Sequence, residues 1–584
     1  MEENLFAEPR KLKGLMLGTL VLMGVLLYAN TLRVPFYLDD VANIEENRAI
    51  QLHSLQFSNL AGAGTGGLLT NRPVANLSFA LNYYINGMNP AGFHVVNTLI
   101  HVLAGVFLFL FLVKTFGLPQ HAVARDDALV LAFGGALLWL VNPLHTQSVT
   151  YIVQRMNSLA ALFFVMALYC YAQGRTEAGK GRQLTWLAGA GVSGLLALGT
   201  KENAATLPFF ILLYEWFFIQ DLSSAWLRKH LPLFLGVLIA IALIGYFYLG
   251  TTPFDAIQAT YKMRDFSLIE RVLTQFRVVI FYIGLLLFPY PARLSLEHDF
   301  PVSHSLFNPP MTFFAILAIL ALLGLALYLA RRQRFIAFAI LWFLGNLVIE
   351  SSVIGLEMVF EHRTYLPAML VFPMIVLLLG RWLKAPPLWV VLGVLTIVFS
   401  WWTVERNNLW LDPVKFWQEC VHKAPTNPRP YNNLGQVLFE RGEVEAAVGQ
   451  YRQALQHKPS FFMAHNNLGI ALKTQGKIRE AARHFVMALD GDPGNAKIHN
   501  NLGNIYAGLG DYDKAALHLE EALRIDPGYA SAYNNLGNLM MFKGRVSEAI
   551  TYYRQALAIT PGNADARHNL GVALRQAAKL PVSR

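Results

Sequence analysis

Charged residues are scarce in this chain of 584 residues: Asp, Glu, Lys and Arg make up 14% of it, and hydrophobic residues make up 55%. About 25% of the residues of an average soluble domain are charged, so these proportions exclude a protein that is water-soluble throughout. Cysteine is scarcer, with Cys170 in an apolar run and Cys420 in a polar region. Two such separated cysteines indicate no disulfide framework. The apolar residues are spread unevenly, and we infer at least two domains of different solvent class.

Long apolar runs alternate with short polar ones up to about residue 404. A run of roughly 17–25 apolar residues can cross a membrane as a helix. The first run lacks a small-residue cleavage site, so we interpret it as an uncleaved span. The candidate spans are 13–31, 93–116, 128–144, 148–172, 184–200, 204–220, 231–250, 311–330, 335–352, 365–382 and 388–404. The sequence therefore predicts about eleven spans, besides an ambiguous apolar helix at 271–289.

Basic residues set the expected orientation of these spans. The stretch RKLK (10–13) precedes the first span, which places the N-terminus in the cytoplasm. If helix 271–289 is re-entrant or interfacial, RRQR (331–334) and RWLK (381–384) also lie inside. The C-terminal half then lies outside. This positive-inside bias explains the net charge of +10 better than nucleic-acid binding does.

The first external loop, 32–92, is long and begins with the stretch FYLDDVAN (36–43). Two adjacent carboxylates beside a membrane are costly unless they are solvated, paired or used. The stretch PVANLSFALNYYI (73–85) predicts a helix that lies along the membrane surface. The expected external face is rich in polar residues at the ends of spans, namely Asp39, Asp40, Arg72, His94, His145, Lys201, Glu202, Glu361, His362 and Arg363.

A 34-residue period governs the polar C-terminal part of the chain. The stretch YNNLG begins at 431 and 533, HNNLG at 465 and 499, and RHNLG at 567, and a proline recurs in phase. This period resembles the tetratricopeptide repeat, in which small residues let two antiparallel helices pack closely. We expect four full repeats, preceded by a half unit and followed by one helix. The predicted domains are 1–404 in the membrane, 405–426 as a connecting half-repeat, and 427–584 as the repeat domain.

One asparagine of each repeat precedes the leucine of the LG pair: Asn433, Asn467, Asn501, Asn535 and Asn569. Equivalent residues of a solenoid line up along one groove. Such a ladder of amides can hydrogen-bond an extended peptide backbone, and it resembles the asparagine ladder with which the O-GlcNAc transferase repeats grip acceptor peptides. The alternative is a set of structural asparagines that satisfy neighbouring carbonyl groups.

Several motifs occur in a characteristic order along the chain. They are YLDD, NRPVANLSFALNYYINGMNPAGFHVVNTLIH (71–101), NPLHTQSVTYIVQRMNSLAALFF (142–164), GTKENAATLPFFILLYE (199–215), EHRTYLP (361–367) and RNNLWLDPVKFW (406–417). Together with the repeats, they resemble the transmembrane-and-tetratricopeptide-repeat O-mannosyltransferases, which belong to the GT-C membrane glycosyltransferases. The resemblance covers nearly the whole chain and implies an all-α fold, a polytopic helix bundle followed by a repeat solenoid.

The resemblance also implies an activity. The donor is expected to be a polyprenyl-phosphate monosaccharide, and the acceptor a Ser or Thr hydroxyl of an exported protein. Short loops and compact size are similar to bacterial members, which implies a bacterial inner membrane and a periplasmic repeat domain. The expected partners are thus a lipid-linked sugar, an acceptor protein and membrane lipids, without nucleic acid.

A hydroxyl group that attacks an anomeric carbon needs a base to take its proton. The family's motif places its essential carboxylate in the first external loop, which implies that Asp40 or Asp39 is the base. Adjacent residues point in different directions, and Asp40 is slightly preferred. The alternative is a solvated pair of loop residues or a helix cap.

The leaving group is a lipid phosphate, so cations should face it. Arg155 is the first candidate, because an arginine inside a span is expensive and can fork two hydrogen bonds to a phosphate. It can instead snorkel to the surface or pair within the bundle. Arg72 and Arg363 are secondary candidates. Lys201 beside Glu202 is either a phosphate contact with a supporting carboxylate or a buried ion pair.

His94, Asn97 and His101 share one face of the second span, which favours packing or lining of the donor site over a metal cluster. His145, Glu202, Glu361 and His362 are expected to line the site as well. Some GT-C relatives bind a divalent cation through several carboxylates. The branch that uses monosaccharides generally works without one, so we expect no metal cofactor, although Mg²⁺ or Mn²⁺ is possible.

Two other function classes compete with a glycosyltransferase. One is a membrane-anchored repeat scaffold without catalysis, and the other is a polyprenyl-dependent transferase of surface polysaccharide. An arginine inside a span and about eleven spans have no use in a simple anchor. Repeats that bind a peptide argue against a glycan acceptor.

Overall fold

The computed structural model describes residues 9–119, 125–250, 252–261, 264–383 and 385–579. Every regular element within this described part is a helix, which confirms the predicted all-α fold. By internal contacts the chain divides into two compact units. We call Met1–Leu296 with Phe300–Asp412 the membrane unit, and Glu297–Asp299 with Pro413–Arg584 the repeat unit. Lys384, the last residue of the RWLK stretch, lies outside the described residues.

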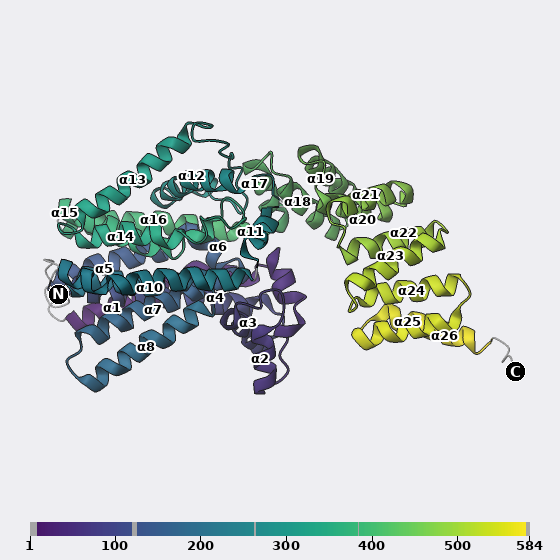
Figure 1. Ribbon diagram of the computed structural model, residues 1–584, viewed down its shortest axis with the longest axis horizontal. Coiled ribbons are helices and arrows are strands. Elements are labelled where there is room, and N and C mark those ends of the chain that lie inside the picture. Colours follow the sequence, from purple (N-terminus) through teal and green to yellow (C-terminus); the bar gives the residue numbers. More distant parts are fainter. Residues whose placement is uncertain (1–8, 120–124, 251, 262–263, 384, 580–584) are drawn as a thin grey trace. The chain divides into compact units, whose positions relative to one another are not determined.

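The membrane unit has a helix at every apolar run predicted from the sequence (Figure 1). Its helices are α1 (Pro9–Tyr28), α2 (Phe57–Thr65), α3 (Pro73–Asn86), α4 (Pro90–Phe116), α5 (Arg125–Leu140), α6 (Thr146–Val149), α7 (Arg155–Thr176), α8 (Lys180–Leu198), α9 (Leu207–Tyr214), α10 (Ser224–Leu249), α11 (Pro253–Tyr261), α12 (Leu268–Leu287), α13 (Met311–Leu329), α14 (Arg334–Leu347), α15 (Val371–Trp382) and α16 (Ala385–Leu409). Helix α7 packs against both α4 and α8, so it occupies the interior of the bundle.

Six helices of the described residues are long and apolar enough to cross a membrane. They lie in Arg10–Arg33, Pro90–Phe116, Ile152–Thr176, Ser224–Leu243, Met311–Leu329 and Pro386–Leu409. The bent pair Asp127–Leu140 and Pro143–Val149 makes a seventh if it is one span. Arg334–Leu347 and Pro367–Trp382 are apolar but shorter. The predicted count of eleven therefore stays a prediction, as does the re-entrant or interfacial position of α12.

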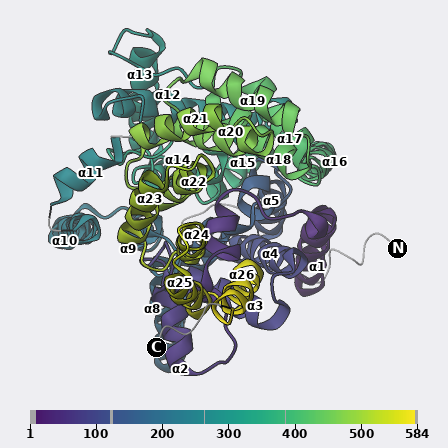
Figure 2. The same ribbon diagram turned by 90° about the vertical axis from the view of Figure 1, so that its right-hand side faces the viewer.

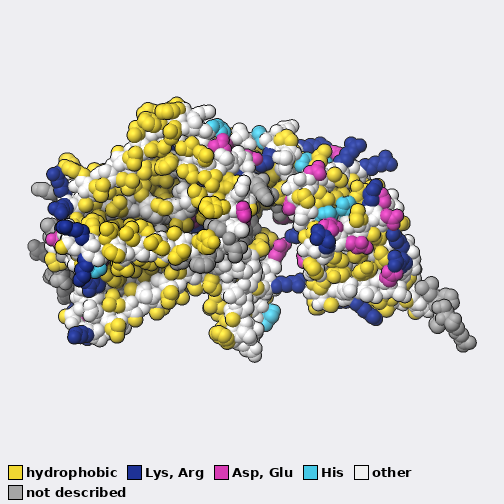
Figure 3. Space-filling view, in the orientation of Figure 1, with side chains coloured by type: hydrophobic (Ala, Val, Ile, Leu, Met, Phe, Trp, Pro, Cys, Tyr) yellow, Lys and Arg dark blue, Asp and Glu magenta, His cyan; other side chains and the backbone are white. Residues whose placement is uncertain are grey.

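The outer surface of the membrane unit is apolar. Figure 3 shows a broad area of hydrophobic side chains over its helices, with Lys and Arg at the end where α1 begins. Only 6% of the most apolar window of α10 and 17% of that of α13 are buried. An apolar surface of this extent is unfavourable in water and suits lipid. The chain is therefore a multi-pass membrane protein.

The long loop at 32–92 contains α2 and α3. Helix α3 begins at Pro73, a residue that favours the first turn because its missing N–H would have no partner there. One face of α3 is buried, including Phe79, whereas Ile85 is 83% exposed. The helix predicted at 73–85 is thus confirmed, and its position along the membrane surface stays a prediction.

The repeat unit consists of successive antiparallel helix pairs (Figure 2). Its helices are α17 (Pro413–Lys423), α18 (Pro428–Glu440), α19 (Val444–His457), α20 (Phe462–Thr474), α21 (Ile478–Gly491), α22 (Ala496–Gly508), α23 (Tyr512–Ile525), α24 (Ala530–Phe542), α25 (Val546–Ile559) and α26 (Ala564–Ala577). Four pairs, from α18 to α25, form the full repeats. The single helices α17 and α26 flank them, as the 34-residue period predicts.

The glycine of each LG pair explains how closely the two helices of a repeat approach. A Cβ atom added to Gly435 would lie 2.7 Å from the ring of Tyr451 in the second helix. At Gly469 the same atom would lie 3.0 Å from Phe485. Real Cβ atoms are rarely this close to a neighbour, so a larger residue would push the helices apart. The period in the sequence therefore records a packing requirement.

Candidate functional site in the membrane unit

The two aspartates of FYLDDVAN lie in different surroundings. Leu38 has a left-handed backbone with a φ of 42°, which turns the chain just before them. The carboxylate of Asp40 is buried and accepts the backbone N–H groups of Tyr37 at 2.9 Å and Val153 at 2.6 Å. Burial raises the pKa of Asp40 well above its ordinary value. Asp40 thus ties the loop to the segment that leads into α7, and its side chain caps no helix.

The side chain of Asp39 is exposed. Its backbone N–H donates to the hydroxyl of Tyr151 at 2.9 Å. Burial, and then the neighbouring aspartates, raise the pKa of that hydroxyl well above its ordinary value, so Tyr151 stays protonated. An exposed carboxylate can meet an incoming hydroxyl group, whereas one held by two backbone amides cannot. The two carboxylates thus differ in exposure, and the choice between Asp39 and Asp40 as the base stays a prediction.

Arg155 is fully buried near the start of α7 and is surrounded by acceptors of the protein itself. Its Nε donates to Asn97 at 2.6 Å, and its terminal nitrogens donate to Asn82 at 2.8 Å and to backbone carbonyls. The guanidinium also lies 4.7 Å from the centre of the Phe79 ring. These contacts join α3, α4 and α7. They favour a positioning role, and phosphate binding by Arg155 stays a prediction that they do not support.

Polar side chains of α4 also contact backbone carbonyl groups of neighbouring segments. His94 Nε2 lies 2.9 Å from the carbonyl of Val34, and Asn97 donates to the carbonyl of Val149 at 3.0 Å. His101 contacts the carbonyl of Leu140 at 2.9 Å. Three elements are thereby fastened to one helix face, which agrees with the packing interpretation of these residues.

Two ion pairs contact the first turn of α7. Arg72 makes a two-pronged contact with Glu202, at 3.0 Å and 2.6 Å. Lys201 pairs with Glu350 and donates to Asn157 at 2.6 Å. An ammonium group has three N–H donors, and these two contacts leave one of them unassigned among the described residues. Burial raises the pKa of Glu202, but Arg72 and Lys201 outweigh this effect and lower it overall.

His362 lies close enough to Lys201, Arg363 and Arg72 for the charges of all three to act on it. Burial lowers the pKa of the His362 imidazole well below its ordinary value, and the charges of Lys201, Arg363 and Arg72 lower it further. Arg363 donates to the carbonyl of Glu357 at 2.8 Å and lies over the ring of Phe360.

We call Arg72, Lys201 and Arg363 the cation cluster. Two carboxylates, Glu202 and Glu350, pair directly with it. Arg363 instead donates to the backbone carbonyls of Glu357 and Met358. A partly desolvated cation is suited to a phosphate group.

One short segment links the aspartates with the cation cluster. At its start, Tyr151 contacts Asp39 and Val153 contacts Asp40. At its end, Met156 Sδ accepts from Arg72 at 3.1 Å, and Asn157 accepts from Lys201. Seven residues of chain can span at most roughly 25 Å. The segment 151–157 therefore contacts both the acid pair and two of the cations, and Arg155 lies within it.

Two further predicted residues are buried nearby. Glu361 accepts the backbone N–H of Ser295 at 2.6 Å. His145 lies among the rings of Trp139 and Tyr365, and neither of its ring nitrogens has a hydrogen-bond partner within the described residues. Within the same part of the chain, no group of three or more His, Cys, Asp or Glu side chains is placed to hold a metal ion. The expectation of a site without metal stays a prediction.

Sequence reasoning missed Tyr151, Asn157 and Glu350. Tyr151 and Asn157 lie within the motif 142–164, on either side of Arg155, which is the costlier residue to bury. Glu350 lies near the end of the predicted span 335–352 and belongs to none of the quoted motifs. Its pairing with Lys201 joins segments far apart in the chain, and no pattern within one segment signals it.

In the repeat unit the predicted asparagine ladder exists, but part of it is structural. The side-chain amides of Asn467, Asn501, Asn535 and Asn569 each donate to the first asparagine of the preceding repeat, at 2.8–3.3 Å. These bonds join consecutive repeats. Each bond uses one of the two N–H groups of a ladder amide, so the other N–H remains for an extended peptide. The oxygens of Asn433 and Asn467 also accept from the asparagine before them.

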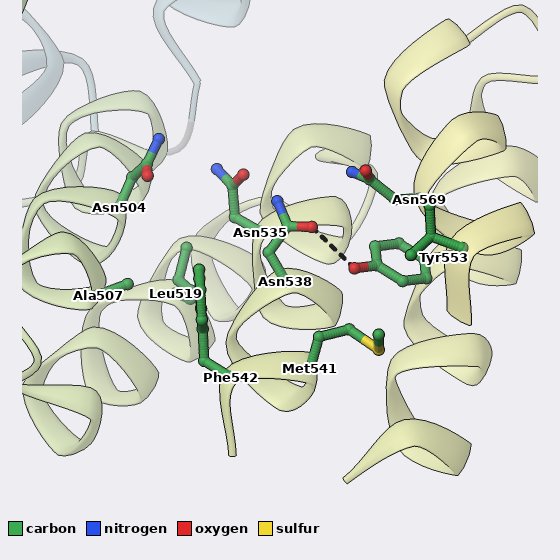
Figure 4. Close-up of a pocket in the computed structure, with 10 residues that line it drawn as sticks. Asn504, Ala507, Leu519, Asn535, Asn538, Met541, Phe542, Tyr553 and Asn569 are labelled. Atoms are coloured by element: carbon green, nitrogen blue, oxygen red, sulfur yellow. Dashed lines mark hydrogen bonds between the residues drawn. The ribbon is translucent and has the colours of Figure 1, made fainter. Parts of the chain in front are cut away.

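The repeat unit contains a pocket of about 330 Å³, which is lined by residues of helices α22 to α26 (Figure 4). Four asparagine side chains, Asn504, Asn535, Asn538 and Asn569, lie in a row on one side of it. Ala507, Leu519, Met541, Phe542, Tyr553 and Val572 complete its lining. The pocket thus combines an amide rim with an apolar floor.

Comparisons with known proteins agree with this architecture. Tetratricopeptide-repeat family models match residues 435–476, 467–530 and 541–576. Protein O-mannosyl-transferase TMTC1 of Homo sapiens is 26% identical over 490 residues, which cover 74% of this chain and 54% of that protein. Protein O-mannosyl-transferase Tmtc3 of Drosophila melanogaster is 24% identical over 510 residues, again 74% of this chain and 54% of that protein.

The chain is a relative of the TMTC proteins. The alignment with TMTC1 runs through both units, which neither a repeat protein nor a membrane bundle alone would give. Protein O-mannosyl-transferase TMTC2 of Homo sapiens is 29% identical over 289 residues, 46% of this chain and 33% of that protein. The chain thus spans between a third and about half of the length of the TMTC proteins that it matches.

Solved structures match the repeat unit. The tetratricopeptide-repeat protein YrrB is 23% identical, with a TM-score of 0.25 over 28% of this chain and 85% of that one. The Thermus thermophilus protein TTC0263 is also 23% identical, with a TM-score of 0.26 over 30% of this chain and 94% of that one.

Proposed function

We propose that the chain is a membrane glycosyltransferase that transfers a monosaccharide from a polyprenyl-phosphate donor to Ser or Thr hydroxyl groups of exported proteins. The names of the TMTC relatives support an O-mannosyltransferase-like activity on protein. The observation that carries the proposal is the segment 151–157, which contacts the aspartates at one end and the cation cluster at the other.

The reaction joins the hydroxyl oxygen of the acceptor to the anomeric carbon of the sugar. As this bond forms, the carboxylate of Asp39 takes the hydroxyl proton, and the bond between the anomeric carbon and the lipid phosphate breaks. The phosphate leaves with the electron pair, and its growing negative charge is stabilised by the cation cluster. His362, held neutral, adds no charge to this balance.

Asp40 and Arg155 act through the backbone. Asp40 fixes the turn that presents Asp39, and Arg155 fixes the start of α7 and with it the segment 151–157. Because both side chains are buried and use their polar atoms on the protein, we assign them as positioning residues.

We infer that the site and the repeats lie on the outer face, with the N-terminus in the cytoplasm. The basic residues of RKLK, RRQR and RWLK support this orientation by the positive-inside rule. In a bacterial inner membrane the outer face is the periplasm, where exported acceptor proteins are available. The repeats then hold the acceptor polypeptide while its hydroxyl group reacts.

Deletion of the gene tests the proposal. The host strain is complemented with the wild type or with Asp39→Asn, and intact exported proteins are weighed by mass spectrometry. We expect the deletion to remove a sugar-sized mass that the wild type restores and Asp39→Asn does not. Unchanged glycoforms in the deletion would instead indicate a scaffold, and loss of surface polysaccharide alone would indicate a glycan acceptor.

A further inference from the structure

The pocket of the repeat unit exists because the third repeat has two short side chains. At the position of Ala507, the other repeats have Phe439, Lys473, Met541 and Arg575. At the position of Leu519, the other repeats have Tyr451, Phe485 and Tyr553, all aromatic. Both short residues line the pocket. The two short side chains are therefore specific to this part of the solenoid.

The lining of this pocket has no charge. None of its ten residues is Asp, Glu, Lys or Arg. Burying an unpaired charge against such a surface is costly, whereas burying an apolar side chain is favourable. An acidic or basic residue of a ligand is therefore disfavoured in this pocket.

The amides of the rim retain hydrogen-bonding capacity of both kinds (Figure 4). Asn538 accepts the hydroxyl of Tyr553 at 2.8 Å, which leaves its N–H groups for a ligand. Asn535 and Asn569 donate to the preceding repeat, which leaves their carbonyl oxygens. Asn504 is exposed. Donors and acceptors side by side match the alternating C=O and N–H groups of an extended polypeptide.

We propose that this pocket selects an uncharged, extended segment of the acceptor polypeptide, with one aromatic or long aliphatic side chain in the space left by Ala507 and Leu519. The assignment of the ligand as acceptor rests on the proposed function, but the selectivity rests on the pocket alone. The pocket thereby determines which Ser- and Thr-bearing segments the protein retains.

Binding of defined peptides tests this selectivity. The probes are fluorescein-labelled peptides of Ser, Thr and Gly that differ at one central residue, which is Phe, Leu, Ala, Asp or Lys. Their binding to the full-length protein in detergent is followed by fluorescence anisotropy. We expect the Phe and Leu peptides to bind about tenfold more tightly than the Asp and Lys peptides, because only they bury an apolar side chain.

Two matched variants locate the effect. Ala507→Phe fills the pocket with phenylalanine, the residue that the first repeat has at the equivalent position, Phe439. The fold should therefore tolerate the substitution, and the binding preference should disappear. Lys473→Phe places the same residue at the equivalent position one repeat earlier, which does not line the pocket, and should leave the preference unchanged. Equal binding of all five peptides to the wild type, or an unaltered preference in Ala507→Phe, would overturn the proposal.

The same peptides separate this inference from the proposed function. Sugar transfer without any side-chain preference in binding would refute the pocket assignment and leave the glycosyltransferase intact. Conversely, a preference abolished by Ala507→Phe in a protein that transfers no sugar would refute the enzyme and leave the pocket as a selective docking site.

Discussion

Polar residues serve different purposes in the two units. In the membrane unit, Arg155 and Asp40 direct their polar atoms to backbone groups and buried amides. In the repeat unit, an asparagine such as Asn535 donates to the preceding repeat and still presents an oxygen at the pocket. Burial among apolar helices requires that every polar group be satisfied, whereas a solvated groove permits partial use.

This difference changes how a buried charged residue is interpreted. An arginine inside a span suggests function because its burial costs free energy. Hydrogen bonds within the protein reduce the same cost, and Arg155 makes such bonds. Asp39, in contrast, is exposed, which is why we propose it as the base. A costly buried residue thus indicates the framework of a proposed site, and an exposed polar residue indicates the group that can meet a substrate.

The largest effect is expected from Arg155→Gln. Its loss leaves several buried acceptors unpaired, at about 1–3 kcal/mol each, so we expect the membrane unit to lose most of its stability. The measurement is thermal unfolding in detergent, with the exposed Arg228→Gln as control. A variant that melts like the wild type but no longer uses the donor would show that Arg155 binds phosphate and that the comparison between the units is wrong.

A smaller effect is expected when one cation is removed without leaving its partner charged. Lys201→Met combined with Glu350→Gln deletes an ion pair, so the net charge of the buried region is unchanged. We expect normal folding and transfer slowed about a hundredfold, since one stabilising contact to the phosphate is lost. The measurement is transfer rate against donor concentration. A wild-type rate would mean that this pair is structural only.

The smallest effect concerns pH in the repeats. The Nδ1 atoms of His465 and His484 lie 2.9 Å apart, and those of His499 and His518 lie 3.0 Å apart, so each pair shares one proton in a hydrogen bond. Burial, and then the partner histidine, lower the pKa of His484 and His518 below the ordinary 6.5. The unfolded chain therefore binds more protons, and stability present above pH 6.5 is lost as the pH falls below it.

Hydrogen exchange checks this expectation. After correction for intrinsic rates, amides of α20–α23 should exchange several-fold faster at pH 5.5 than at pH 7.5. Glu480 raises the pKa of His484 and Glu521 raises that of His518, so both moderate the effect, whereas Arg452 lowers the pKa of His484 further. The matched control replaces both pairs by tyrosine, as in the natural pair of Tyr533 and Tyr552. Equal pH dependence in this variant would remove the histidines from the explanation.

The sequence predicts the two units well because each has a strong periodic signal. The 34-residue step locates the helix pairs, and hydropathy locates the long apolar helices of the membrane unit, but not α2 or α11. It could not rank Asp39 and Asp40, because that depends on the left-handed turn at Leu38 and on the N–H of Val153, which is distant in sequence. Nor could it reveal the pairing of Lys201 with Glu350.

Transfer by the purified protein tests the central claim most directly. The full-length chain in detergent is supplied with a polyprenyl-phosphate hexose and a Ser/Thr peptide, and single-turnover rates are measured for the wild type, Asp39→Asn and Asp40→Asn. We predict that Asp39→Asn folds normally and loses about 10²–10⁴ in rate, as expected for a lost general base, whereas Asp40→Asn is destabilised and its folded fraction keeps transfer. Normal transfer by Asp39→Asn would contradict the account.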